Sequence, residues 1–183
     1  MGLPAWRNWA ALNILTAAQL NTDIRDNGKF LTNPPQCCAY HNIAQNIPNA
    51  TPTPVALNSE RFDDESLVAS TMHSTVVNNS RITPVVAGLY LCTFNLQYAP
   101  QATAAGYRKA YMLVNGAIFV AGQTCVTSTA VNATPIPLTC TRKWRFNGTT
   151  DYIQGIALHT AGVGLNVEAS TGYECELTVV RVG

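Results

Sequence analysis

The residues that could do chemistry in this 183-residue chain are few and far apart. An enzyme needs a nucleophile with a base, a cluster of metal ligands, or paired carboxylates in a pocket. His41, His73 and His159 show no HxH or HExxH spacing. No GxSxG or phosphate-binding loop occurs, and Gly162-Val163-Gly164 is too short for a nucleotide fingerprint. We therefore expect no catalytic site, no metal and no cofactor.

The acidic side chains form two small groups. Asp63, Asp64 and Glu65 are consecutive, so their side chains diverge, and the spaced ligands of a calcium loop are missing. We expect a solvated loop there. Glu174 and Glu176 lie two residues apart on an expected strand and so share a face, as solvent-exposed pairs often do.

Six cysteines raise the question of disulfides. They are Cys37, Cys38, Cys92, Cys125, Cys140 and Cys175. Two are adjacent, one falls on an apolar strand face, and no CxxC pair suggests zinc. Free cysteine commonly behaves as a small buried hydrophobe, so we expect all six to be reduced. The pair to test first for a disulfide is Cys125–Cys140, across an expected hairpin.

The composition limits the partners of the chain. Charged residues make up 11% of it, against about 25% in typical soluble domains. The net charge is +1, so we expect no binding to nucleic acid or to an anionic membrane. No apolar run approaches the ~18 residues of a membrane span, and no secretory signal is visible at the N-terminus. We expect synthesis in a cytoplasm.

One strand organises the elements that follow residue 36. From Leu89 the sequence alternates, which places Tyr90, Cys92, Phe94, Leu96 and Tyr98 on one face. A period of two over ten residues with a wholly apolar face predicts a central strand of a β-sandwich. The residues that we expect in the core or in contacts between copies are Tyr90, Phe94, Leu96, Tyr98, Tyr111, Tyr152 and Ile156.

Shorter strands are expected on both sides of it. Residues 37–60 predict an irregular edge strand, because three prolines interrupt them. Asn115-Gly116 between apolar runs predicts a tight hairpin. Further strands are expected over residues 73–77, 107–115, 138–146, 151–158, 165–167 and 173–182. Residues 99–106 and 124–135 predict surface loops, with Tyr107, Thr127 and Thr129 as candidate ligand-facing residues. Eight to ten strands fit an all-β jelly roll over residues 37–183.

Residues 1–36 differ from the rest and predict a short helical segment. Thr16 and Gln19 have the spacing of a capping box, and Leu15 with Leu20 that of a hydrophobic staple. We expect a helix that ends at Asn27-Gly28, followed by a stiff linker at Pro34-Pro35.

That helix carries a narrow apolar stripe, made up of Ala17, Leu20, Ile24 and Leu31. The stripe must pack against its own sandwich, a copy of itself or another protein, because so short a helix is not stable alone. Trp6 and Trp9 precede it and either cover the base of the sandwich or anchor contacts.

The sandwich resembles C1q/TNF-like jelly rolls. The resemblance rests on the order of Ala87-Gly88-Leu89-Tyr90, the Asn115-Gly116 hairpin, Gly148 with Asp151-Tyr152-Ile153, and the final strand at residues 173–182. Proteins of this family are generally compact homotrimers. The resemblance therefore implies a homotrimer with a binding or structural role rather than a catalytic one.

Residues 6–35 are similar to the N-terminal segment of many tailed-phage virion proteins. The similarity extends from Trp9 through residues 15–27 to Phe30-Leu31 and Pro34-Pro35. It implies an attachment segment in which Asp23, Arg25 and Asp26 are available for contacts with other virion proteins.

Two functions follow from these resemblances. The first is a structural protein of a virion, made in the host bacterial cytoplasm, as a minor tail or baseplate appendage or as a capsid decoration or head fibre. Its partners would be a major capsid, tail or baseplate protein. The second is an adhesion module that presents its loops to a host-surface glycan or protein. The loops contain few aromatic residues, which favours the structural role.

Overall fold

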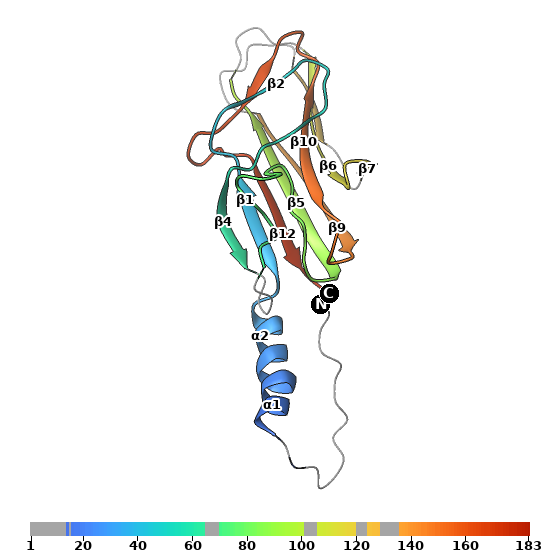
Figure 1. Ribbon diagram of the computed structural model, residues 1–183. Helices are drawn as coiled ribbons and strands as arrows, with labels where there is room; N and C mark the ends of the chain where they lie inside the picture. The colour runs from blue at the N-terminus through green and yellow to red at the C-terminus, as the bar shows by residue number, and fades with distance from the viewer. Residues whose placement is uncertain (1–13, 15, 65–69, 101–105, 120–123, 129–135) are drawn as a thin grey trace.

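The computed structural model describes residues 14, 16–64, 70–100, 106–119, 124–128 and 136–183, which form a two-sheet β-sandwich with a helix projecting from one end (Figure 1). The helix consists of α1 (Ala17–Leu20), the π-helical η1 (Asn21–Asp26) and α2 (Asn27–Thr32). Within the described residues the strands are β1 (Gln36–Tyr40), β2 (Gln45–Ile47), β3 (Thr53–Pro54), β4 (Ser59–Asp64), β5 (Gly88–Tyr98), β6 (Gly106–Val114), β7 (Ile118–Phe119), β8 (Thr124–Ser128), β9 (Ile136–Phe146), β10 (Ile153–His159), β11 (Leu165–Val167) and β12 (Glu176–Arg181). The helices among these residues are too short and too polar to cross a lipid bilayer.

The two sheets are antiparallel. The first follows the order β2-β11-β5-β12-β1-β4, with β9 on the other edge of β5. The second follows the order β3-β10-β6-β7, and β8 also pairs with β6. Strand β5 pairs with β9 along its whole length, from Gly88 opposite Phe146 to Tyr98 opposite Ile136. This makes β5 the central strand, as its alternation predicts.

Alternate side chains of β5 fill the space between the sheets. Tyr90, Cys92, Phe94, Leu96 and Tyr98 are all fully buried, and the residues between them are half-buried. The Tyr90 ring meets Phe146 edge-on at 5.6 Å between centroids, and its hydroxyl donates to the Val86 carbonyl oxygen at 2.8 Å. A buried tyrosine thus fills apolar volume while its polar atom stays paired.

The hairpin expected at Asn115-Gly116 joins β6 to β7. Asn115 and Gly116 have φ values of 53° and 71°, as the central residues of a type I′ turn require. The Ala117 N–H donates to the Val114 carbonyl oxygen at 3.2 Å and closes the turn.

The stretch expected to be one irregular edge strand is several strands. Residues 37–60 contribute to β1, β2, β3 and β4, and β1 lies between β12 and β4 rather than at an edge. Cys37, Cys38 and Ala39 are buried in β1 and precede the prolines that interrupt the stretch. The edge prediction is therefore wrong for β1.

Two loop assignments are also wrong. The surface excursion expected at residues 124–135 contains strand β8, which pairs with β6 from Gly106 opposite Ser128 to Ala110 opposite Thr124. The acidic residues expected in a loop lie in β4, except Glu65, which is outside the described residues. The Asp63 carboxylate accepts hydrogen bonds from the backbone N–H groups of Met72 and His73, both at 3.0 Å to Oδ2.

The strand expected at residues 73–77 is absent from this described stretch. Here the Asp63 carboxylate accepts the His73 N–H, and the Ser74 hydroxyl accepts the Val77 N–H at 3.1 Å. Side-chain acceptors of this kind satisfy the backbone locally, and so compete with strand pairing.

The helix is longer than predicted. Its capping box is present, with Gln19 N–H to Thr16 Oγ1 at 3.3 Å and Thr16 N–H to Gln19 Oε1 at 2.8 Å. It continues through Gly28 to Thr32, because Phe30 is buried and stacks on the Arg181 guanidinium at 4.4 Å. It ends at Asn33, whose backbone is not helical, because the proline that follows disfavours the helical conformation at this position. Leu15 of the expected staple is outside the described residues.

A close approach between the sheets gives the first testable prediction. A Cβ added to Gly155 on β10 would lie 2.3 Å from Cε2 of Phe94. We expect Gly155→Ala to lower the free energy of unfolding by about 1–3 kcal/mol, because the ring and both strands must shift. Urea unfolding followed by circular dichroism measures this. Gly28→Ala is the control, since nothing lies within 4 Å of its added Cβ. Equal stability of Gly155→Ala and the parent would contradict the packing.

Candidate functional site

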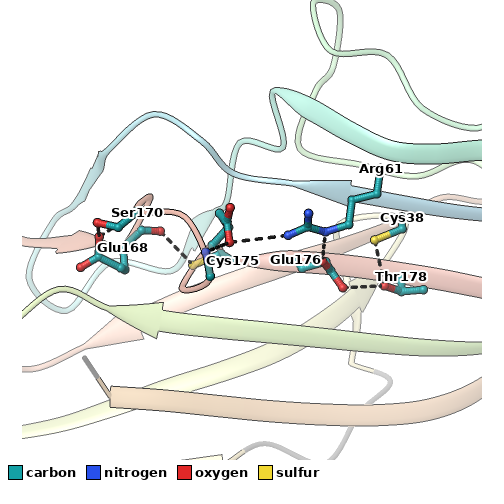
Figure 2. A network of polar contacts seen from close by, with 9 residues as sticks. Cys38, Arg61, Glu168, Ser170, Cys175, Glu176 and Thr178 are labelled. Atoms are coloured by element: carbon teal, nitrogen blue, oxygen red, sulfur yellow. Dashed lines mark hydrogen bonds and ion pairs between the residues drawn. The ribbon is translucent and has the colours of Figure 1, made fainter. Parts of the chain in front are cut away.

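A polar cluster extends from β4 across the end of β1 to the start of β12 (Figure 2). Arg61 of β4 places Nε 2.7 Å from Glu176 Oε2 and Nη2 3.5 Å from Glu174 Oε2. The guanidinium also stacks on the Tyr40 ring at 4.6 Å. The Glu174 side chain is only 10% exposed. The expectation of a solvent-exposed glutamate pair is therefore wrong, because both carboxylates bind one arginine.

The cluster continues to two thiols. Thr178 Oγ1 lies 3.3 Å from Glu176 Oε1 and 3.4 Å from Cys38 Sγ. Cys175 Sγ accepts the Gln97 N–H at 3.2 Å. Burial raises the pKa of Cys38 to about 11 and that of Cys175 to about 12. Both thiols are protonated at neutral pH, so neither is an activated nucleophile.

The other described cysteines are similar. Cys37, Cys38, Cys92, Cys140 and Cys175 are buried free thiols. Burial raises the pKa of Cys92 and of Cys140 to about 12. Cys125 and Cys140 are not opposite each other in a hairpin, since β8 pairs with β6 and β9 with β5. That hairpin expectation is wrong.

The three histidines have separate structural roles. His41 Nδ1 lies 2.7 Å from the Ala56 carbonyl oxygen and His159 Nε2 lies 2.8 Å from that of Ile47. Burial lowers the pKa of both, which keeps the imidazoles neutral near pH 7. Among the described residues, no three His, Cys, Asp or Glu side chains are grouped so as to hold a metal.

The described residues among those expected for attachment lie on the projecting helix (Figure 1). Leu20, Ile24 and Leu31 are 38%, 64% and 66% exposed. Arg25 Nε pairs with the neighbouring Asp26 Oδ1 at 2.8 Å, and Asp23 is half-buried. Trp6 and Trp9 are outside the described residues. The described part of the segment therefore presents an uncovered apolar stripe and one local ion pair.

Most residues expected in the core are buried. They are Tyr90, Phe94, Leu96, Tyr98, Tyr111 and Ile156. Tyr152 is half-buried instead, with the Arg81 guanidinium 4.7 Å from its ring centroid. It sits just before β10, where the alternation that places Ile153 inside turns Tyr152 outward.

Two of the three residues expected to face a ligand lie in strands. Tyr107 is half-buried in β6 and Thr127 belongs to β8, while Thr129 is outside the described residues. The sequence did not single out Arg61 or Arg81. Both gain their partners only through tertiary contacts, so no local signal could have identified them.

The comparisons with known proteins bear on the fold. No protein-family model and no curated protein sequence matches the chain. The crystal structure of murine APRIL at pH 5.0 superposes with a TM-score of 0.55 and 8% identity, over 81% of this chain and 98% of that chain. The structure of Eiger TNF from S. frugiperda superposes with a TM-score of 0.49 and 12% identity, over 81% of this chain and 94% of that chain. The chain has a TNF-like jelly-roll fold. This confirms the predicted fold class, and such low identity says nothing further about function.

The burial of the thiols gives the second prediction. The test uses the variant Cys125→Ser, because the structure does not describe the Cys125 side chain. We expect its five remaining thiols to resist the thiol reagent DTNB at about pH 8, since all five are buried. All five should react in urea without added reductant. Absorbance of the released chromophore measures both. Rapid labelling in the native state would contradict the burial, and fewer than five thiols in urea would reveal a disulfide.

Proposed function

We propose that the chain is a non-enzymatic structural protein of a tailed-phage virion, a homotrimer that attaches to the particle through its N-terminal segment. The observation that carries this proposal is the helix that projects beyond the sandwich with an exposed apolar stripe (Figure 1). Exposed apolar groups in contiguous array are typical of interaction sites. The similarity of residues 6–35 to phage virion proteins supports the proposal that the particle is a tailed-phage virion. The protein would then be located in the virion.

The spacing of the stripe supports association of copies. Ala17, Leu20, Ile24 and Leu31 follow one another at intervals of three, four and seven residues. In the sequence these intervals match the 3.5-residue period of a coiled-coil seam, which the π-helical η1 (Asn21–Asp26) interrupts in the structure. Parallel helices from three copies would cover the stripe and stabilise the helix through packing of its apolar face. The TNF-like fold is consistent with a trimer of the sandwiches in the same particle.

In such a trimer the polar side of the helix faces outward. Arg25 and Asp26 fall in the seven-residue repeat at positions next to each other and away from the seam. They would contact a major capsid, tail or baseplate protein, together with the tryptophans at positions 6 and 9. Host-surface adhesion is a second candidate, favoured by one specific feature, a polar cleft beside Arg81 and Tyr152.

The trimer gives the third prediction. Light scattering of the full chain should report three times the 19.7 kDa of one chain. We expect Ile24→Asp to shift the population toward monomer, because three carboxylates would meet at the seam. Lys29→Asp is the control, since Lys29 is exposed on the opposite side of the repeat. A monomeric mass for the parent chain at micromolar concentration would contradict the trimer.

Attachment gives the fourth prediction. Deletion of residues 1–35 stops just before β1, which begins at Gln36. We expect the truncated protein to keep the circular dichroism of a β-sandwich and to be missing from purified particles assembled in its presence. Immunogold labelling measures incorporation, and the full chain is the control. If the truncated protein is incorporated equally well, attachment lies in the sandwich instead.

A further inference from the structure

A cleft of about 340 Å³ lies between the segment 71–83 and residues 150–152, just before β10. The two segments are joined by the backbone bridge between Ile82 and Ile153. The side chains that matter for its chemistry are Ser74, Asn78, Arg81, Thr83, Thr150 and Tyr152. Its volume falls at the lower end of the range for small-molecule sites, which begins at about 300 Å³. The proposed attachment of the helix does not use this cleft.

The wall of the cleft is held firmly by hydrogen bonds. Ile82 and Ile153 exchange backbone hydrogen bonds at 3.0 and 2.9 Å, and Thr83 N–H donates to Met72 O at 2.7 Å. The His73 imidazole is fully buried between Glu60 Oε1 at 2.8 Å and Asn79 O at 3.2 Å. Such a wall keeps its shape without a ligand, which lowers the entropic cost of binding.

Among the described residues, Arg81 is the one guanidinium that lines the cleft. It stacks on the Tyr152 ring at 4.7 Å, and in the part of the chain that the structure describes it forms no ion pair with a carboxylate. Stacking fixes the plane of a guanidinium and leaves its N–H edge available for a bidentate anion.

The described carboxylates nearby already have other partners. Glu60 binds His73, Asp63 binds the backbone N–H groups of residues 72 and 73, and Asp151 Oδ1 accepts from Asn115 Nδ2 at 2.9 Å. None of them neutralises Arg81 by an ion pair. The cleft therefore offers one positive charge among hydroxyl and amide groups, with Met72 and Val77 as apolar parts of its lining.

We propose that this cleft binds a sugar that carries a carboxylate. The Arg81 fork would receive the carboxylate, while Ser74, Thr83 and Thr150 hydroxyls exchange hydrogen bonds with ring hydroxyls of the sugar. A single guanidinium matches the single charge of a carboxylate, whereas a phosphate dianion calls for further cations. The hydroxyl and amide lining favours a polyhydroxylated ligand over an apolar one, because every buried ligand hydroxyl needs a partner.

Titration of the full-length protein with sodium glucuronate tests the proposal, with glucose and glutarate as matched probes. Amide and side-chain chemical shifts in NMR spectra report binding and its location. We expect glucuronate to bind in the millimolar range with shifts at residues lining the cleft, and glucose and glutarate to bind at least about tenfold more weakly. Equal binding of glutarate would assign a simple carboxylate site, and equal binding of glucose a neutral one; either overturns the proposal.

Two substitutions of Arg81 distinguish the contribution of the planar guanidinium group from that of its positive charge. We expect Arg81→Gln to abolish measurable glucuronate binding and Arg81→Lys to weaken it about tenfold, because lysine keeps the charge without the planar fork. Arg142→Gln, at an exposed arginine on β9 that does not line the cleft, should bind as the parent does. Undiminished binding by either folded Arg81 variant, or no binding by the parent protein, would overturn the proposal. Neither result bears on the trimer or on attachment.

Discussion

The structure depends on the burial of one face of β5. Tyr90, Phe94 and Tyr98 lie along this face with no exposed area, so the opposite sheet must accommodate three large rings. Gly155 allows β10 to lie directly on Phe94, and His159 of the same strand meets Tyr98 edge-on at 5.8 Å. Because interiors are close-packed, the ring positions fix the height and register of β10. The remaining strands of the second sheet follow from pairing with it.

The sequence predicted the elements whose signals are local. The alternation of β5, the positive φ values at Asn115-Gly116 and the capping box at Thr16 each arise within a few residues of chain. They are decided by side-chain period and backbone sterics, which need no knowledge of distant partners. The jelly-roll class followed from the number and spacing of such strands.

The errors share the opposite cause. The polar residues of β8 form a strand because β6 offers an edge, and the residues around His73 do not because Asp63 caps their backbone. The helix passes Gly28 because Phe30 reaches Arg181, more than a hundred residues away in sequence. Likewise, the sequence placed Glu174 and Glu176 on one side of the chain but could not show that Arg61 faces them. Tertiary contacts override propensity at each of these positions.

Charged residues are few in this chain, so the partners of each one can be compared. With 11% charged residues, the outer surface is mostly neutral, and Arg61 binds two glutamates while Arg25 binds its neighbouring aspartate. Arg81 and Arg181 are each stacked on an aromatic ring and form no ion pair within the described residues, and of the two only Arg81 lines the cleft. The proposed trimer would carry three copies of the cleft that Arg81 lines, held together by the three helices. Weak single-site binding then becomes strong through effective concentration, provided that the ligands are spaced to reach two clefts at once. A structural role for the helix and a binding role for the sandwich are thus compatible in the same particle, since they use separate surfaces.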